Sequence, residues 1–460
     1  MELRLGINSR NAQNRSLFTQ MLLFALPIMG MNLLQLLFNA ADMVVVGRFS
    51  GREALGAVGA TGSLINLIVN LFMGLSVGIS VVVAQDYGAK KVENIRQSVH
   101  TSIAISGIGG LVVSLVGFVL SEPLLKMMGT PADIIKQSTL YMKIFFLGVP
   151  ASMVYNFGAA ILRAVGDSKR PMYFLTVSGI VNVFLNMFFI IILNMDVAGV
   201  AWATVISQYL AMILILLSLS KHEGVLRFNW RMLRINREKL KEIMRIGIPA
   251  GIQSTLFSIS NVLIQSAVNS FGSVMVAANA AAGNVEGLIG TTMNAYYNAA
   301  ITFTGQSMGA KDYDRIDQVA KVSGFLIFGT WIALGSLILF FGSSLIGFYT
   351  TSPEVIDLGM IRLKIMLSIY FTCGAMNVFP GLTRAMGFSI SPMLVTLVGT
   401  CIMRIVWLVT IFAWFPTPFV LFLCYPVTWA LAGSGQVGLF FYARRAIRKE
   451  KEPLISGAVG

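Results

Sequence analysis

The chain has 460 residues, of which 56% are hydrophobic and 12% charged, with a mean hydropathy of +0.77. Soluble globular domains carry about 25% charged residues, so the composition excludes a soluble domain and indicates a membrane protein with several spans. A net charge of +14 is compatible with nucleic-acid binding, but the placement of the basic residues in alternate loops argues against it.

Twelve apolar segments are each long enough to cross a hydrocarbon core, which takes about 20 helical residues. In the first half we expect spans near residues 17–46, 54–84, 99–120, 138–162, 172–193 and 199–220. In the second half we expect them near residues 245–270, 274–308, 320–349, 358–383, 392–415 and 418–443. Backbone groups in lipid must bond to one another, and the period-2 alternation of a membrane barrel is absent, so the spans are predicted to be α-helices. The first segment is too long for the apolar core of a cleavable signal peptide.

The two halves repeat one another at a spacing of about 221 residues. The matching residues of the first half are Gln85, Gly88, Ala89, Lys90, Asn156, Arg163, Ala164, Gly166, Pro171 and Met172, and those of the second half are Gln306, Gly309, Ala310, Lys311, Asn377, Arg384, Ala385, Gly387, Pro392 and Met393. Pro27 and Pro249 match after a slip of one residue. A repeat this long is a duplicated domain, which is a common construction in transporters. We therefore predict a first lobe over residues 1–220, a connector over 221–245, a second lobe over 246–443 and a tail over 444–460.

Basic residues are concentrated in the N-terminal tail and in every second loop after it. These segments hold 26 of the 34 Lys and Arg residues, whereas the intervening loops hold four. Short cytoplasmic loops carry such an excess, so both termini are predicted to be cytoplasmic. Because each half has six spans, both halves enter the membrane in the same direction, and the repeat is parallel about an axis along the membrane normal. Within the connector region, the pattern from Arg231 to Ile246 predicts a basic amphipathic helix on anionic lipid.

Ionisable groups within spans are costly and mark functional sites. Asp42 and Glu286 are the acids that we place well inside spans, and Arg404 is the basic residue near the middle of one. Lys143, Arg362 and Lys364 are predicted to lie near outer helix ends, where their side chains can reach the interface. The cysteines Cys373, Cys401 and Cys424 lie in apolar segments without pairing or metal-ligand spacing. No phosphate loop or nucleophile triad is present, so we expect neither an enzyme nor a bound cofactor.

Asp42 has amides and a hydroxyl on the neighbouring predicted helices. Asn182 and Asn186 are four residues apart and share one face of the fifth span. Asn156 lies on the fourth span and Thr204 on the sixth. Such a carboxylate can hold a proton, since burial disfavours its charged form, or can hold Na⁺, which suits oxygen ligands. The alternative is a carboxylate that is hydrogen-bonded only to close the helix bundle.

Glu286 and Arg404 lie at similar predicted depth in the second half. We expect them to form a buried ion pair that keeps the carboxylate charged, with a role for Glu286 in binding a cationic substrate as the alternative. The second half has Ile264, Met403 and Trp407 where the first has Asp42, Asn182 and Asn186. Ion coupling is therefore predicted to reside in the first half.

Pro27 interrupts the first span, where proline removes one helix hydrogen bond and permits a kink. Because Pro27 shares that helix with Asp42, we predict a hinge whose bend responds to protonation of the acid. A static kink is the alternative.

Three motifs in the first half resemble those of the MATE family of multidrug and toxic compound extrusion transporters. They are Ala-Asp-Met-Val-Val-Val-Gly at 41–47, Gln-x-x-Gly-Ala-Lys at 85–90 and Leu-Arg-Ala-Val-Gly-Asp-Ser-Lys-Arg-Pro at 162–171. The resemblance covers nearly the whole chain. It implies an all-α integral membrane protein of twelve helices in two lobes. It also implies an antiporter in a bacterial plasma membrane that exports amphiphilic or cationic compounds in exchange for H⁺ or Na⁺.

The resemblance also implies roles for individual residues. Asp42 matches the family's first-helix acid, and Asn156, Asn182 and Thr204 match its polar cluster in the first lobe. Asn186 stands where several members have a second Asp, and the single carboxylate that remains favours H⁺ over Na⁺. We expect a monomer whose partners are small amphiphilic molecules and membrane lipids, with no nucleic acid.

Two other functions are weighed against this one. A lipid-linked saccharide flippase shares the broader fold, but it would be expected to carry several cations for its pyrophosphate cargo, where only Arg404 is predicted. A receptor or channel without coupled transport is disfavoured by the duplicated halves and the embedded Asp42.

Overall fold

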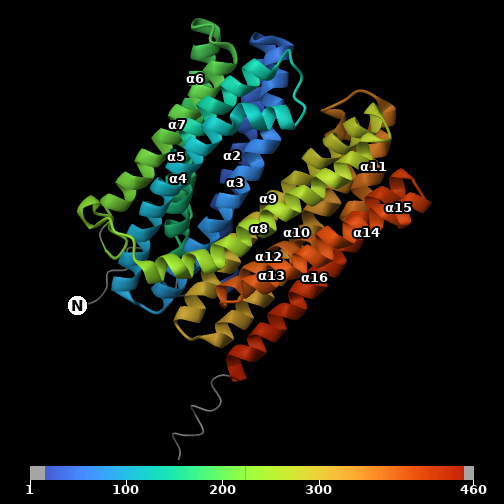
Figure 1. The fold of residues 1–460 in the computed structure, drawn as a ribbon. Helices are drawn as coiled ribbons and strands as arrows, with labels where there is room; N and C mark the ends of the chain where they lie inside the picture. The colour runs from blue at the N-terminus through green and yellow to red at the C-terminus, as the bar shows by residue number, and fades with distance from the viewer. Residues whose placement is uncertain (1–15, 223, 450–460) are drawn as a thin grey trace, which may run out of the picture. The chain divides into compact units, whose positions relative to one another are not determined.

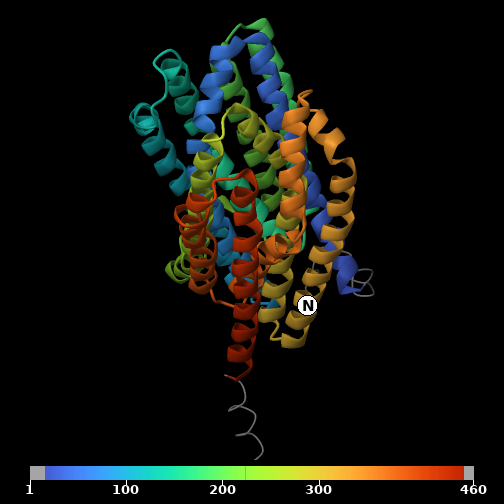
Figure 2. The same cartoon turned by 90° about the vertical axis from the view of Figure 1, so that its right-hand side faces the viewer.

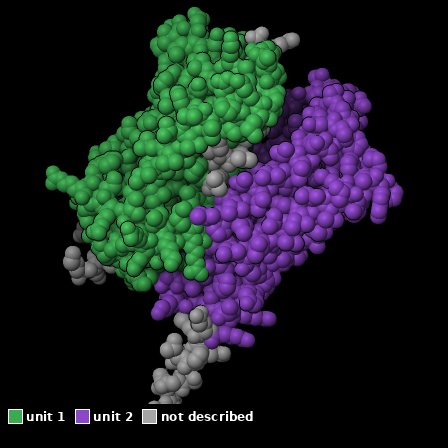
Figure 3. All heavy atoms as spheres, viewed as in Figure 1, with its two compact units in different colours: residues 1–15, 26–247 green, residues 16–25, 248–460 purple. Residues whose placement is uncertain are grey.

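A computed structural model describes residues 16–222 and 224–449 (Figure 1). Nearly all of this part of the chain is helical, and it contains no strand. Its residues form two compact units, one comprising 26–247 and the other comprising 16–25 and 248–449 (Figure 3). Within each unit the helices lie side by side as a bundle, as Figure 1 and Figure 2 both show. The all-α membrane fold predicted from composition is therefore confirmed.

The first half of the chain folds into six helical segments. They are α2 (Leu17–Phe49), α3 (Gly51–Gly88), α4 (Val92–Met127), α5 (Ile135–Ala164), α6 (Lys169–Met187) with the π-helical turn η1 (Phe188–Ile192), and α7 (Asp196–Ser220).

Six further segments follow a short 3₁₀ turn in the connector, η2 (Trp230–Met232). They are α8 (Arg237–Asn269), α9 (Ser273–Gly309), α10 (Tyr313–Gly347), α11 (Pro353–Leu367) with α12 (Tyr370–Ala385), α13 (Ile390–Thr396) with the π-helical η3 (Leu397–Ile402), α14 (Met403–Val409) and α15 (Ile411–Trp414), and α16 (Pro418–Lys449). These twelve segments coincide with the twelve predicted spans, and most extend beyond them by several residues. By length and apolarity, nine of the described helices could each cross a membrane, or ten if the bent pair α11 and α12 counts as one.

The sequence repeat corresponds to a repeated turn geometry. Lys90 and Lys311 end the Gln-x-x-Gly-Ala-Lys motifs with φ of 55° and 59°. Gly166 and Gly387 end α5 and α12 with φ of 96° and 98°. In all four cases a residue with positive φ stops the helix, as C-terminal caps commonly do. The repeated residues therefore determine where helices end.

The packing of helices is also repeated within each unit. In unit 1, α5 packs against α3, α4 and α7. In unit 2, α12 packs against α9, α10 and α16, which are the equivalents of those three helices in the repeat. Small residues permit close approach: a Cβ on Gly110 of α4 would lie 2.6 Å from the Pro150 Cα of α5. Such contacts are a usual way for membrane helices to associate.

The tenth predicted span is broken, which the sequence analysis missed. Helices α11 and α12 meet at an angle of 56° across Ser368 and Ile369. The break frees backbone groups that lipid cannot satisfy. One of them, the carbonyl of Leu367, accepts a hydrogen bond of 2.7 Å from the Trp331 indole nitrogen on α10. A neighbouring helix thus compensates for the break.

The predicted amphipathic helix from Arg231 to Ile246 is wrong over its first six residues. The α-helix begins only at Arg237 and continues into the seventh span as α8. The cause is the Asn236 side chain, which accepts hydrogen bonds from the backbone N–H groups of Glu238 and Lys239 at 2.9 and 3.1 Å. Asn is a strong N-cap because its side chain satisfies these otherwise unpaired donors.

Candidate functional site

Asp42 on α2 is bonded to one of the two amides of α6 with which its position in the sequence grouped it. The Asn186 side-chain nitrogen donates a short hydrogen bond to the Asp42 carboxylate. The same nitrogen lies 3.3 Å from the Asn182 side-chain oxygen. Asn186 and Asn182 are 1% and 6% exposed, and Asp42 is partly buried. The four-residue spacing on α6 places both amides on the face that meets α2.

An apolar cluster lies next to this carboxylate. Its buried members include Val46, one turn beyond Asp42 on α2, and Tyr141 on α5, with further residues from α3, η1 and α7. Tyr141 is also within electrostatic range of Asp42. Apolar packing of this kind excludes water from the adjoining end of the bundle, and in such surroundings the interactions of a carboxylate are strong.

Two residues of the predicted cluster instead bond to their own helices. The Thr204 hydroxyl donates to the Val200 carbonyl at 3.0 Å. The Asn156 side-chain nitrogen donates to the Ser152 carbonyl at 2.8 Å and lies 3.3 Å from its hydroxyl oxygen. Hydrogen bonds therefore connect Asp42, Asn186 and Asn182, whereas Thr204 and Asn156 bond within their own helices.

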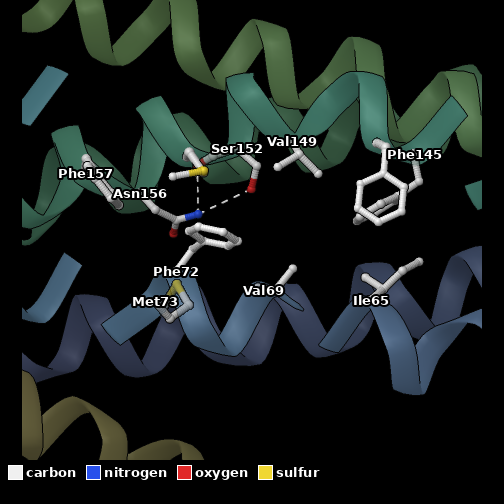
Figure 4. Close-up of a pocket in the computed structure, with 11 residues that line it drawn as sticks. Ile65, Val69, Phe72, Met73, Phe145, Val149, Ser152, Asn156 and Phe157 are labelled. Atoms are coloured by element: carbon white, nitrogen blue, oxygen red, sulfur yellow. Dashed lines mark hydrogen bonds between the residues drawn. The ribbon is translucent and has the colours of Figure 1, made fainter. Parts of the chain in front are cut away.

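Asn156 belongs to a different feature, a pocket between α3 and α5. The pocket holds about 470 Å³ of empty space, including its open mouth. Figure 4 shows Asn156 and Ser152 on one wall, with Phe72 and Met73 of α3 opposite. The remaining lining is apolar and partly aromatic: Ile65, Val69, Phe145, Phe146, Val149, Met153 and Phe157. A pocket with many apolar groups and two polar ones is typical of small-molecule sites.

Pro27 lies inside α2, which continues as a helix on both sides of it. The division between the two compact units crosses this helix between Ala25 and Leu26, just before the proline. The second division falls between Gly247 and Ile248, just before Pro249 in α8. At each division a proline removes one helix hydrogen bond. The proposed hinge motion at Pro27 stays a prediction.

The predicted ion pair between Glu286 and Arg404 is wrong. Glu286 on α9 pairs with Arg362 on α11, with an O–N distance of 2.8 Å. Their side chains are 13% and 8% exposed, so the expectation that Arg362 reaches the interface is also wrong. The reason is the start of α11 at Pro353, which places Arg362 nine residues, or about 13 Å, into the helix. A neutralised Glu286 offers no unbalanced negative charge to a cationic substrate.

Arg404 on α14 is fully buried, in agreement with its predicted position. One terminal nitrogen, Nη1, donates to the Asn261 side-chain oxygen at 2.7 Å and to the Ser260 hydroxyl at 3.2 Å, both on α8. The guanidinium also lies over the rings of Tyr425 and Phe257, at 4.7 and 5.3 Å from their centroids. Polar and aromatic neighbours therefore take the place of the expected carboxylate.

Comparison with known proteins gives the family. The family model described as MatE matches the chain twice, over residues 27–188 and 249–410. The chain belongs to the MATE family. The double match also confirms the internal duplication, with a spacing of 222 residues between the two matched regions.

Relatives and solved structures extend this result. The probable multidrug resistance protein YoeA of Bacillus subtilis is 30% identical over 83% of this chain and 84% of its own length. The probable multidrug resistance protein NorM of Thermotoga maritima is 24% identical over 83% of this chain and 82% of its own. A multidrug resistance MATE family transporter solved in an outward-facing conformation has a TM-score of 0.88 at 22% identity, covering 97% of this chain and 99% of the other. A Vibrio cholerae MATE transporter, VcmN, has a TM-score of 0.87 at 22% identity, covering 93% of this chain and 97% of the other.

Sequence reasoning missed several residues of this MATE protein that the structure brings together. Ser152 is one turn before Asn156, so the spacing alone could have indicated it. The helix start at Ser352-Pro353 carries the usual signal of proline in the first turn, which would have placed Arg362 deeper. No local signal relates Arg404 to Tyr425 and Phe257, because these contacts depend on how α8, α14 and α16 pack.

Proposed function

We propose that this MATE protein is a secondary active multidrug exporter that exchanges amphiphilic, often cationic compounds for H⁺ across a bacterial plasma membrane. Relatives named as multidrug resistance and multidrug export proteins support the cargo class. The observation that carries the coupling proposal is the Asp42 carboxylate, embedded in a predicted span and bonded to Asn186, which in turn contacts Asn182. Both termini are cytoplasmic in this proposal, in accordance with the basic loops.

The Asn186 amide can serve both protonation states of Asp42. Its nitrogen donates to the charged carboxylate. Its oxygen is buried and has no hydrogen-bond partner in the described part of the chain. A protonated carboxyl group gains an O–H donor, and a half-turn of the amide would then offer the Asn186 oxygen as acceptor. The half-turn gives the buried Asn186 oxygen a partner and moves the amide nitrogen away from the Asn182 oxygen.

The same arrangement favours H⁺ over Na⁺. Sodium needs several oxygen ligands, by analogy with the harder divalent cations. At Asp42 the nearest amide presents its nitrogen, and the Asn182 oxygen already faces that nitrogen. No group of three or more His, Cys, Asp and Glu side chains with metal-binding geometry occurs among the described residues.

The pocket between α3 and α5 is proposed to contact the cargo. Aromatic faces attract flat and cationic groups, and Met73 and Met153 are adaptable side chains that suit varied ligands. The Asn156 and Ser152 side chains supply polar groups at one place on the wall. Because Asn156 lies on α5 and Asp42 on α2, cargo and proton would act on different helices of unit 1.

The test is efflux of a fluorescent cation such as ethidium from proteoliposomes under an imposed pH gradient or an imposed Na⁺ gradient. We expect the pH gradient to drive efflux by the wild type, and Asp42→Asn to abolish that response. Asp42→Glu should retain part of it, because a carboxyl group remains. A response to Na⁺ alone would overturn the choice of ion, and equal pH-driven efflux by Asp42→Asn would overturn the site.

A lipid-linked saccharide flippase is the second candidate. The observation that favours it is a second buried arginine in unit 2, Arg362, beside Arg404. Its charge is balanced by Glu286, so Arg404 is the cation that an anionic cargo would meet. Transfer of a fluorescent anionic lipid between leaflets, with no efflux of cationic dye, would support the flippase.

A further inference from the structure

One edge of the Arg404 guanidinium has no partner. Nη1 is hydrogen-bonded to α8, whereas Nε and Nη2 are buried and make no hydrogen bond to any described residue. The N–H groups of Nε and Nη2 point the same way and form the side-on fork that carboxylates bind in bidentate fashion. The side chain is 0% exposed, so bulk solvent does not reach these donors.

The aromatic neighbours do not fill this role. Tyr425 and Phe257 lie against the guanidinium face, where ring electrons attract the cation. The N–H groups lie in the guanidinium plane and need acceptors in that plane. The two rings and the α8 bonds therefore orient the guanidinium and leave its fork without an acceptor among the described residues.

The charges around Arg404 do not balance. Glu286 is within electrostatic range of both Arg404 and Arg362, but its carboxylate is bonded to Arg362. The three groups together carry two positive charges and one negative charge. Removing an unbalanced charge from water costs several kcal/mol, so one further negative charge would stabilise the cluster.

We propose that unit 2 contains a binding site for one small monovalent anion, held by the Nε–Nη2 fork of Arg404. The ligand is either a free ion such as chloride or nitrate, or the carboxylate of an amphiphilic molecule. A single negative charge balances the cluster, and a planar carboxylate or nitrate matches the fork. Asn261, which bonds Nη1 of the same guanidinium, is exposed on α8. This site is separate from Asp42 and does not depend on the proposed transport.

The experiment measures thermal unfolding of the purified full-length protein in detergent. Sodium gluconate is replaced stepwise by sodium chloride or nitrate at constant ionic strength and pH. A ligand that binds the folded state raises the unfolding temperature with concentration. A second arm adds an amphiphilic carboxylate in gluconate buffer, with its uncharged amide as the control. Wild type is compared with Arg404→Met, Arg404→Lys, Glu286→Gln and the remote control Arg444→Gln.

We expect wild type and Arg444→Gln to be stabilised equally, Arg404→Met not at all, and Arg404→Lys at least tenfold more weakly because lysine has no fork. Glu286→Gln should bind the anion roughly tenfold more tightly, because a competing negative charge is removed. Stabilisation by chloride or nitrate identifies a free-ion site, and stabilisation by the carboxylate alone identifies an organic ligand. The proposal is wrong if no anion stabilises wild type more than Arg404→Met, or if Glu286→Gln weakens binding.

Discussion

The pair of Glu286 and Arg362 gives the sharpest stability test in unit 2. Their N–O distance is 2.8 Å, and Arg362 also donates to the Asn279 carbonyl at 2.7 Å. Removing one partner of a buried pair typically costs about 3–5 kcal/mol, because the other charge is left uncompensated. We therefore expect Glu286→Gln and Arg362→Met each to lower the free energy of unfolding by about 3 kcal/mol or more. The double variant should then be no less stable than either single variant, which corresponds to a coupling energy of about 3 kcal/mol.

The assay is equilibrium unfolding in mixed SDS micelles, followed by tryptophan fluorescence in chloride-free gluconate buffer. A second cycle, Glu286→Gln with Arg404→Met, provides the matched control. Arg404 makes its direct hydrogen bonds to Ser260 and Asn261, so its coupling to Glu286 should be clearly smaller. A coupling to Arg404 equal to or larger than that to Arg362 would refute the assigned pairing.

Three further predictions concern packing, helix caps and a second buried pair, each read out as the free energy of unfolding in the same micelles. Gly110→Ala should cost about 1–3 kcal/mol, because its Cβ would lie 2.6 Å from the α5 backbone; Gly107→Ala, with open space around it, should cost nothing. Gly387→Ala should cost about 1–2 kcal/mol through its φ of 98° alone. Gly438→Ala, at a helical position with open space around it, should stabilise the protein slightly. Equal effects of the two substitutions would contradict the role of Gly387 as a helix cap. Lys239→Met should cost about 3 kcal/mol, because the buried carboxylate of Asp86, 2.8 Å from the Lys239 nitrogen, would lose its cation. An unchanged free energy of unfolding would show that this pair does not contribute to stability.

Much of the fold could be predicted from the sequence because lipid imposes simple rules. Long apolar segments must be helices, and the 221-residue repeat fixed the equivalence of the halves. Asp42, Asn182 and Asn186 could be related because two amides one turn apart share a helix face. These inferences depend on spacing within one helix or on composition.

The remainder depends on packing between helices, which spacing does not determine. The break at Ser368 has no proline or glycine at it and is compensated by Trp331 from another helix. Arg362 and Arg404 both lie deep, and only the packing of α9, α11 and α14 decides which of them meets Glu286. Asn156 was grouped with Asp42 by chemistry, but its side chain bonds to Ser152 in its own helix.

The central claim, that Asp42 couples proton and cargo, is tested most directly by driving the exchange with a cargo gradient in place of a pH gradient. Coupling between two ligands is reciprocal, so an outward cargo gradient must drive H⁺ inward without any initial pH difference. Proteoliposomes with an internal pH dye should acidify when wild-type protein releases the cargo, and should show no pH change with Asp42→Asn. Equal acidification by Asp42→Asn would contradict the account.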